Sequence, residues 1–498
     1  MIATVLNRSG IPINFRPAAP LFQHPISAKN TVSLWANPCL LRPSNSACHE
    51  SGEEQIMTFK QAVFAAKKST VLRRSQNMYK QLLRDQHLDQ HESEKLQAER
   101  AIAHARFAMQ STEFYREVYS GAGFTLKDLD DPAAFRELPI VEKADVRENP
   151  GKFRSSEATD RNSKVSVTGG STGEPLRLLR DLRTPTRTLE WRLFDWWGVD
   201  PSDDVAILVR RVRSDRAELA HSLQWWPSKR FQLDAYRMTD EKVDEFLARW
   251  DRIGPSLLIG YVGGISELAQ MLATRGIRIR PPRAIAVTAA PMTPAQRQLI
   301  ESAFGAPAFD HYRSAEIPWM AGECSEHNGL HTFADVRKVE VLDGSGRQVA
   351  PGVIGDVVVS DLTNRVFPLV RYRLGDRTTP IAGPCACGIT LPRIEHVTGR
   401  ISEAMRMPDG QIVAGEALSQ TFSRNPAAVR QFQIHQQADY SIVIRCIPGG
   451  DPDARRDIDS AIDQVRDIVR NKVPVRLEIV ESIAHDGGKI RYIKSDLN

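Results

Sequence analysis

Three groups of residues in this chain combine side chains and spacing suited to chemistry, and the first is a loop. The segment Val165 to Pro175 reads VSVTGGSTGEP, a short apolar run followed by glycines and hydroxyl side chains. Glycines let the backbone approach an anion closely, and Ser and Thr hydroxyls donate hydrogen bonds to phosphate oxygens. No lysine follows the last glycine, so this is not the GxxxxGK[ST] loop of NTPases. The segment indicates a phosphate-binding loop, and a plain surface turn is the alternative.

The second group consists of charged residues in four later segments. They are DHYRSAE at 310–316, VRYRLGD at 370–376, GRISE at 399–403 and a glycine-flanked Lys489. A carboxylate can hold Mg²⁺, and a lysine can neutralise charge that develops on a phosphate during transfer. Taken singly, Glu316 and Asp376 could equally be surface carboxylates, and Asp376 could pair with a neighbouring arginine.

The third group is a set of cysteine and histidine side chains. Cys385 and Cys387 lie on a turn rich in Pro and Gly, and Cys324 and His331 lie in the loop region before it. Three thiolates and an imidazole suit a tetrahedral Zn²⁺, whose role would be structural because four protein ligands leave no open position. His327 is the alternate fourth ligand, and isolated reduced cysteines are the alternative to a metal.

Length and composition limit the functions open to the chain. Its 498 residues allow two or three domains, and 41% hydrophobic with 26% charged residues is ordinary for a globular protein. The net charge of +5 argues weakly for anionic ligands and against a nucleic-acid scaffold. No apolar stretch is long enough to span a membrane. Six cysteines do not form a disulfide framework, so reduced thiols in the cytoplasm are expected.

The elements that must position these residues belong to an α/β fold. Residues 58–107 have a strongly helical pattern, and the apolar runs Val205 to Val209 and Ala284 to Val287 predict buried strands. Helical stretches such as 241–250 and 266–274 alternate with them, which favours a largely parallel sheet covered by helices. The segments 339–342 and 355–360 then indicate a smaller β-subdomain.

The last hundred residues predict a separate small domain. Strands are expected at 431–435, 441–447 and 475–480, with an amphipathic helix at 453–472 between the second and third. We therefore predict an N-terminal domain at 57–398 and an α+β C-terminal domain at 399–498. Residues 1–56 have no acidic residue before Glu50. They indicate a disordered or mis-assigned extension, with an organellar-type leader as the alternative.

In this order, the segments TGGSTGEP, YRSAE, RYRLGD, GR and Lys489 resemble the core motifs of the adenylate-forming enzyme superfamily. The chain is most similar to the phenylacetate-coenzyme A ligase group and its CapK-like branch, over about Met57 to Asn498. The shared segments are Gly260-Tyr261, Gly322-Glu-Cys324, Gly329-Leu-His331, Pro368-Leu-Val-Arg-Tyr, Cys385-Ala-Cys387-Gly388 and the Pro139-x-x-x-Lys143 element. Two positions depart from the family pattern, Gly169 where serine is usual and Arg313 where glycine is common.

The resemblance implies a role for each motif residue. Glu316 would ligate Mg²⁺, Tyr312 would lie against adenine, and Asp376 would accept hydrogen bonds from the ribose hydroxyls. Arg400 would contact the ribose or phosphate, Lys489 would enter from the small domain, and Glu403 would be the interdomain hinge. The ATP phosphates would be held by the loop residues Thr168, Gly170, Ser171, Thr172 and Gly173.

The function implied is ATP- and Mg²⁺-dependent activation of a carboxylic acid through an acyl-adenylate. Coenzyme A is the acceptor that the ligase group implies. Two alternatives stay open: a CapK-like or deazaflavin-type adenylyltransferase with another acceptor, and a catalytically silent nucleotide-binding protein. No nucleic-acid or membrane partner is expected, because the net charge is small and no apolar stretch is long enough to cross a membrane. The acid-binding pocket would be lined from the segments that contain Tyr236, Tyr261, Ala289, Ala290 and Pro291.

Overall fold

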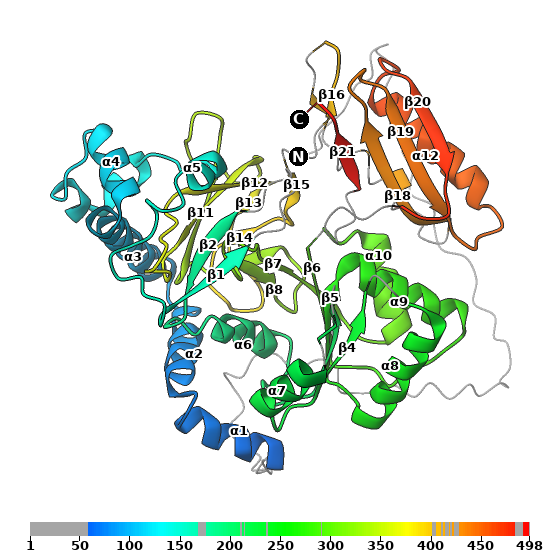
Figure 1. Ribbon diagram of the computed structural model, residues 1–498, viewed down its shortest axis with the longest axis horizontal. Helices are drawn as coiled ribbons and strands as arrows, with labels where there is room; N and C mark the ends of the chain where they lie inside the picture. Colours follow the sequence, from blue (N-terminus) through cyan, green and yellow to red (C-terminus); the bar gives the residue numbers. More distant parts are fainter. Residues whose placement is uncertain are drawn as a thin grey trace, which may run out of the picture. The chain divides into compact units, whose positions relative to one another are not determined.

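The computed structural model (Figure 1) describes most of the chain after residue 57. The described residues are 58–167, 176–209, 212–213, 215–235, 238–289, 291–400, 405–409, 412–413, 418, 421–422, 428–483 and 492–497. The predicted extension at 1–56 lies outside them. No helix among them has the length and apolar character needed to cross a membrane. The proposed boundary between residues 398 and 399 stays a prediction.

The helical N-terminal pattern is confirmed and resolves into several helices. They are α1 (Phe59–Ser69), α2 (Arg73–Asp85), α3 (Gln90–Ser111) and α4 (Glu113–Gly121), followed by the short 3₁₀ helices Asp128–Asp130 and Pro132–Glu137 and by α5 (Lys143–Glu148). The breaks follow local capping signals, because Thr58, Asp89 and Thr112 each accept a hydrogen bond from a first-turn backbone N–H. Each of these capping residues begins a helix, whereas the apolar pattern alone predicts one continuous helical region.

A nine-stranded sheet forms the centre of the large domain. Its strand order is β13-β14-β9-β8-β7-β6-β5-β3-β4. The strands β3 (Val205–Val209), β4 (Arg230–Asp234), β5 (Leu257–Tyr261), β6 (Ala284–Thr288) and β7 (Ala308–Tyr312) are parallel. An antiparallel extension follows, made of β8 (Ala321–Glu323), β9 (Leu330–Thr332), β14 (Arg393–Ile394) and β13 (Pro380–Ile381). The predicted α/β class is therefore confirmed.

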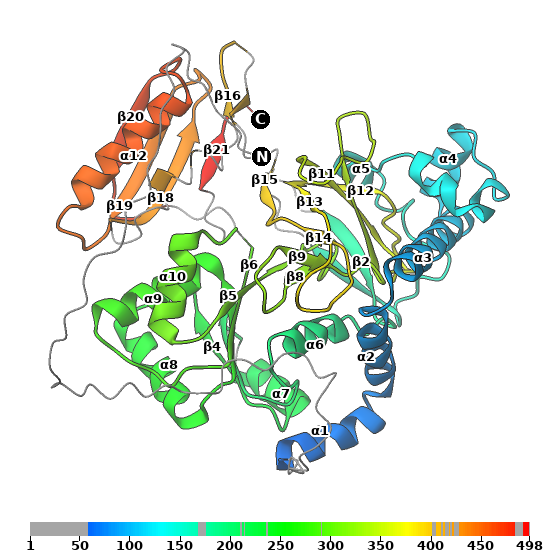
Figure 2. The same ribbon diagram turned by 180° about the vertical axis from the view of Figure 1, so that it is seen from behind.

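Helices cover both faces of the parallel part of this sheet. One face packs in a single apolar cluster with α8 (Asp240–Ile253), α9 (Val262–Thr274) and α10 (Pro294–Phe304). The other face packs against α1, α2 and α6 (Arg187–Trp196), and α7 (Asp215–Trp225) follows β3 in the chain. Figures 1 and 2 show the two helical layers from opposite sides. Burial on both faces explains why β3 and β6 read as unbroken apolar runs.

The β-subdomain is a four-stranded antiparallel sheet of order β10-β11-β12-β15. Its strands are β10 (Arg337–Leu342), β11 (Gly355–Asp361), β12 (Tyr372–Thr378) and β15 (Thr398–Arg400). It shares a core with α3, α4 and the hairpin of β1 (Ser163–Val167) and β2 (Arg177–Asp181). This hairpin carries the glycine- and hydroxyl-rich segment between its two strands.

The C-terminal residues form a small α+β unit around its own core. Its sheet has the order β20-β19-β18-β21, made of β18 (Val429–Gln436), β19 (Ile442–Pro448), β20 (Val475–Ile479) and β21 (Ile493–Ser495). The helix α12 (Ala454–Ile468) packs its apolar side on this sheet, and β16 (Met405–Arg406) pairs with β17 (Ile412–Val413). The helix ends four residues before the predicted limit at Lys472, and β21 was not predicted.

Candidate functional site

The carboxyl ends of the parallel strands place the first site residues at one edge of the sheet. Tyr261 ends β5, Thr288 ends β6 and Tyr312 ends β7, and Tyr261 and Thr288 are directly paired. Ligands of open α/β sheets bind outside this edge. Ala289, next to Thr288, has a φ of 76°. This backbone conformation costs free energy in residues other than glycine, and residues that adopt it are found more often at ligand-binding sites. Tyr236 and Ala290, also expected near the acid, lie outside the described residues.

Asp376 lies next to Tyr312 because of an irregularity in strand β12. The Tyr312 hydroxyl donates a hydrogen bond of 2.6 Å to a carboxylate oxygen of Asp376, which is buried. Gly375 has a φ of 82°, which favours glycine, and the pairing of β12 with β11 and with β15 shifts register around this point. Such bulges re-aim side chains next to sites. The YRSAE and RYRLGD motifs therefore meet.

Other predicted nucleotide-site residues fall partly or wholly beyond what the structure describes. The backbone of Arg400 in β15 pairs with Asp376, which places it beside the same strand, but its side chain is outside the described set. The loop residues Thr168, Gly170, Ser171, Thr172 and Gly173, together with Glu403 and Lys489, also lie outside the described residues. Their roles remain predictions.

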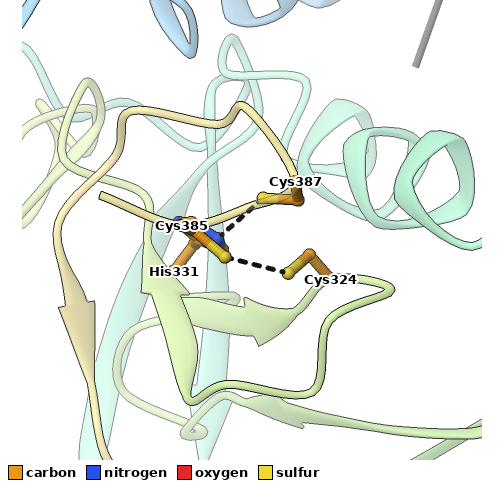
Figure 3. Close-up of side chains that lie close together, drawn as sticks. All are labelled: Cys324, His331, Cys385 and Cys387. Atoms are coloured by element: carbon orange, nitrogen blue, oxygen red, sulfur yellow. Dashed lines mark hydrogen bonds between the residues drawn. The ribbon is translucent and has the colours of Figure 1, made fainter. Parts of the chain in front are cut away.

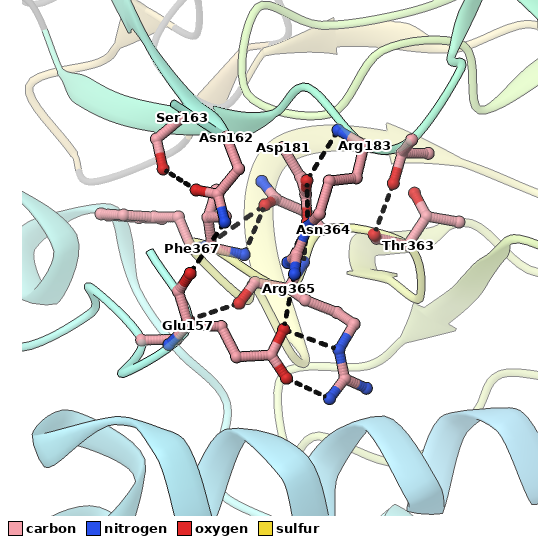
Figure 4. Close-up of polar contacts among 12 residues, drawn as sticks. Glu157, Asn162, Ser163, Asp181, Arg183, Thr363, Asn364, Arg365 and Phe367 are labelled. Atoms are coloured by element: carbon pink, nitrogen blue, oxygen red, sulfur yellow. Dashed lines mark hydrogen bonds and ion pairs between the residues drawn. The ribbon is translucent and has the colours of Figure 1, made fainter. Parts of the chain in front are cut away.

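A polar network anchors the base of the hairpin that carries the loop (Figure 4). The Asp181 carboxylate, at the end of β2, accepts two-point hydrogen bonds from Arg183 and a further one from the backbone N–H of Arg365. The Asn364 side-chain amide donates to the Leu179 carbonyl at 2.9 Å, and the Glu157 carboxylate pairs with both arginines. These contacts tie β2 to the segment just before the VRYRLGD motif.

Glu316 lies opposite a lysine that sequence reasoning had not assigned to the site. Its side chain is only 6% exposed, and one carboxylate oxygen lies 3.3 Å from Nζ of Lys143. Lys143 is held there because Val141 forms two backbone hydrogen bonds of 2.9 Å with Arg371 and Arg373, next to the RYRLGD strand. The Pro139-x-x-x-Lys143 element was the available signal. The pair places a carboxylate and a cation side by side at the position predicted for the metal ligand.

A buried network of charged residues around Glu323 contacts β7, and it was not predicted from the sequence. Glu323 is fully buried and accepts hydrogen bonds from Arg297, His396 and the backbone N–H of Asp310. Burial would raise the pKa of Glu323, but the hydrogen bonds from His327, His396 and Arg297 hold it well below its usual range. Burial raises the pKa of Asp310 to about 7. The network holds β7, the strand that ends in Tyr312, in place. It could not be predicted from the sequence, because Glu323 stands there as a single acidic residue among mostly apolar ones.

A second site is formed by the cysteine and histidine set. Cys324, His331, Cys385 and Cys387 offer ligand atoms that all lie within 4.8 Å of one another (Figure 3). Cys324 follows β8 and His331 lies in β9, whereas the two other cysteines lie in the loop between β13 and β14. Pairing of β9 with β14 brings these segments together. His327, the alternate ligand, instead contacts Glu323 and Arg297.

Comparisons with known proteins agree with the fold. The family model described as CapK C-terminal domain matches residues 405–496. The phenylacetate-coenzyme A ligase of Aromatoleum evansii is 24% identical over 362 residues, which cover 70% of this chain and 80% of that protein. The Escherichia coli K12 enzyme of the same name is 23% identical over 331 residues, covering 63% and 72%.

Solved structures share the fold at lower identity. The 2-hydroxyisobutyryl-CoA ligase in its postadenylation state, in complex with R3-HIB-AMP, matches with a TM-score of 0.68 and 20% identity. The match covers 83% of this chain and 91% of that one. With the motif segments meeting at Tyr312 and Asp376, these likenesses support a relationship of the chain to the adenylate-forming enzymes and, among them, to the phenylacetate-coenzyme A ligases and CapK-like proteins.

Proposed function

We propose that this protein uses ATP to activate a carboxylic acid as its acyl-adenylate and then transfers the acyl group to coenzyme A. The observation that carries the proposal is the hydrogen bond between Tyr312 and Asp376, which brings two motifs together at the carboxyl edge of the sheet. The relatives named phenylacetate-coenzyme A ligase, which match over most of their length, support the same reaction class.

In this proposal the chain mainly positions ATP and neutralises its charge. Asp376 accepts hydrogen bonds from the ribose hydroxyls, Tyr312 lies against adenine, and the hairpin loop binds the phosphates. Such preorganised donors and charges lower the barrier of group transfer. Lys489, from the small domain, stabilises the charge that develops between the acid and the α-phosphate while pyrophosphate leaves.

Magnesium fits the residues present near the phosphate side of the site. Mg²⁺ prefers carboxylate and phosphate oxygens, and Glu316 offers a nearly buried carboxylate that lies beside Lys143. When bound, Mg²⁺ would shield the phosphate oxygens of ATP from the incoming carboxylate. Glu316 would hold it, and Lys143 would remain as a second positive charge beside the nucleotide.

The acceptor distinguishes the main proposal from one rival. In the ligase version, rotation about Glu403 withdraws Lys489 and lets the thiol of coenzyme A attack the acyl-adenylate. The match of residues 405–496 to the CapK C-terminal domain favours a second candidate, an adenylyltransferase that uses another acceptor. Both versions share the adenylation step. ATP and coenzyme A as substrates, together with cysteines expected to be reduced, support a cytoplasmic location for the reaction.

The test is a screen of aromatic and aliphatic carboxylic acids with full-length protein, ATP and Mg²⁺, with and without coenzyme A. We expect acid-dependent release of pyrophosphate and AMP, and a thioester product by mass spectrometry when coenzyme A is present. A Lys489→Ala variant should lose most adenylation, whereas Asp251→Ala, on the exposed side of α8, should not. Release of ADP and phosphate in place of AMP and pyrophosphate would overturn the proposal.

A further inference from the structure

We propose that Cys324, His331, Cys385 and Cys387 bind one structural Zn²⁺ ion. The four ligand atoms come from three separate stretches of chain and converge within 4.8 Å, in the arrangement drawn in Figure 3. Cys324, His331 and Cys385 are buried, and Cys387 is partly exposed. Thiolate and imidazole donors select zinc over Mg²⁺ or Ca²⁺, which take oxygen ligands. The site is distinct from the nucleotide site and does not depend on the proposed function.

Two distances between ligand atoms are close to the edges of a zinc tetrahedron. A zinc–sulfur bond of about 2.3 Å places two sulfur ligands about 3.8 Å apart, and a sulfur and a nitrogen ligand about 3.6 Å apart. The sulfurs of Cys324 and Cys385 are 3.7 Å apart, and Cys387 Sγ lies 3.3 Å from His331 Nε2. The other pairs of ligand atoms also lie within 4.8 Å of one another, so all four are near the spacing that one zinc ion requires.

The imidazole of His331 is oriented for a metal by its other nitrogen. Nδ1 lies 2.9 Å from the carbonyl oxygen of Leu391, which can only accept a hydrogen bond, so Nδ1 carries the proton. Nε2 is then left with its lone pair, and it faces Cys387. A metal-bound histidine commonly donates its second N–H to a backbone carbonyl in this way. The ring is further fixed by an edge contact with Trp196.

A disulfide and a purely apolar cluster of thiols both fit the geometry less well than zinc. A disulfide requires sulfurs about 2.05 Å apart, and the 3.7 Å between Cys324 and Cys385 is far longer. Three thiols that meet only as buried apolar groups would not need an imidazole lone pair directed at one of them. The backbone N–H of Ile389 also approaches Cys387 Sγ at 3.4 Å, a contact that suits a thiolate ligand.

The ion would cross-link two loops of the antiparallel extension of the central sheet and so stabilise it. It would join the β8–β9 turn to the loop between β13 and β14, whose residue Thr390 is hydrogen-bonded to Gln86 just after α2. Strand β8 pairs with β7, which ends in Tyr312. The zinc site would thus stabilise the support of the nucleotide site while lying outside it. With four protein ligands, no position is left for substrate or water.

The test measures metal in the full-length protein, purified without chelators from cells grown with zinc. Elemental mass spectrometry should find about one zinc per chain. Cobalt added to metal-free protein should give the intense absorption bands of tetrahedral thiolate coordination. Less than about 0.1 zinc per chain together with no such bands would overturn the proposal, as would one equivalent of iron in place of zinc. Neither measurement needs enzymatic activity.

Variants make the assignment specific to these residues. Cys387→Ser is the mildest change because its side chain is partly exposed, and it should lower zinc content or affinity at least about tenfold. Cys446→Ala is the matched control, since Cys446 is a free, buried cysteine in the C-terminal core. It should keep the zinc. His331→Cys should retain the metal, whereas His331→Ala should not. Unchanged zinc affinity in Cys387→Ser, or a Cys324–Cys385 disulfide in the isolated protein, would contradict the proposal.

Discussion

The hydroxyl of Tyr312 and the carboxylate of Asp376 are 2.6 Å apart, although 64 residues separate them in the chain. Tyr312 ends a parallel strand of the large sheet, whereas Asp376 lies in the β-subdomain, so the contact joins two sheets. Hydrogen bonds to a buried charged group are among the stronger ones in proteins. The Tyr312 hydroxyl therefore orients the carboxylate of Asp376.

Removal of the Asp376 carboxylate should lower the catalytic efficiency with ATP far more than removal of the Tyr312 hydroxyl. Asp376 is proposed to accept a hydrogen bond from each of the two ribose hydroxyls, and each charge-assisted bond contributes about 1.5–3 kcal/mol, so Asp376→Ala should lower kcat/KM for ATP at least about 100-fold. Tyr312→Phe keeps the ring and should cost about 10-fold. Steady-state kinetics with varied ATP measures both. Equal losses, or an Asp376→Ala variant with unchanged ATP dependence, would remove the ribose assignment.

Variants of Lys143 and of Glu316 should differ in their magnesium requirement. Glu316→Gln keeps the shape but not the charge, so about 10-fold more Mg²⁺ should be needed for half-maximal rate. Lys143→Met leaves the carboxylate and should lower the rate without raising the Mg²⁺ requirement. Magnesium titrations at saturating ATP distinguish the two variants. A Glu316→Gln variant with the wild-type Mg²⁺ requirement would show that another group holds the metal.

The network in Figure 4 predicts that Asn364 positions the phosphate loop through β2. Its side chain donates to the Leu179 carbonyl and accepts from the backbone N–H groups of Val366 and Phe367. Asn364→Ala should speed amide hydrogen exchange in β1 and β2 about tenfold and raise the KM for ATP more than it lowers kcat. Unchanged exchange in the hairpin with normal folding elsewhere would contradict this role.

His396 should make the stability of the large domain depend on pH. Burial opposes its charge, but the hydrogen bond to Glu323 and the nearby Asp310 raise the pKa of His396 overall. The stabilisation is then fully present below the ordinary histidine pKa and is lost as pH rises through the folded-state pKa. A His396→Gln variant should melt about 2–4 °C below wild type at acidic pH, and the gap should close toward alkaline pH. Melting temperatures across the pH range test this, and a gap that widens with pH would reverse the sign.

Asp310 acts on stability in the same direction. Its pKa is raised to about 7 by burial, so between the ordinary aspartate pKa and about pH 7 the unfolded chain releases this proton while the folded protein keeps it, and stability falls as pH rises. The depressed pKa of Glu323 acts with the opposite sign, because its stabilisation is full above the ordinary glutamate pKa and is lost as pH falls below it and protonation removes the hydrogen bonds from the cationic groups. The falling stability from mildly acidic to alkaline pH therefore reports on Asp310 and His396.

Elements with a local signature could be predicted from the sequence. Strand β3 has the bounds expected from the run Val205 to Val209. A strand that is buried on both faces is a continuous apolar run, so its two ends are visible in the sequence as the change to polar residues. The helix α12 shows its buried side in Ile458, Ile462 and Val465. The fold class followed from such segments and from the order of the motifs.

Contacts that depend on distant partners could not be predicted in the same way. The burial of Glu323 requires Arg297 and His396, which lie on other elements and have ordinary sequence surroundings. Lys143 reaches Glu316 across 173 residues because of a backbone pairing with β12. The cysteine spacing gave the ligand types, but only the pairing of β9 with β14 brings the loops together.

The central claim is that the carboxylate attacks the α-phosphate of ATP, and isotope transfer tests it most directly. An acid accepted in the screen would be labelled with ¹⁸O in its carboxylate and turned over with ATP, Mg²⁺ and coenzyme A. We predict that AMP acquires one heavy oxygen from the acid, because the acyl–AMP bond breaks on the carbonyl side when the thiol attacks. Unlabelled AMP, or heavy oxygen recovered in phosphate, would contradict it.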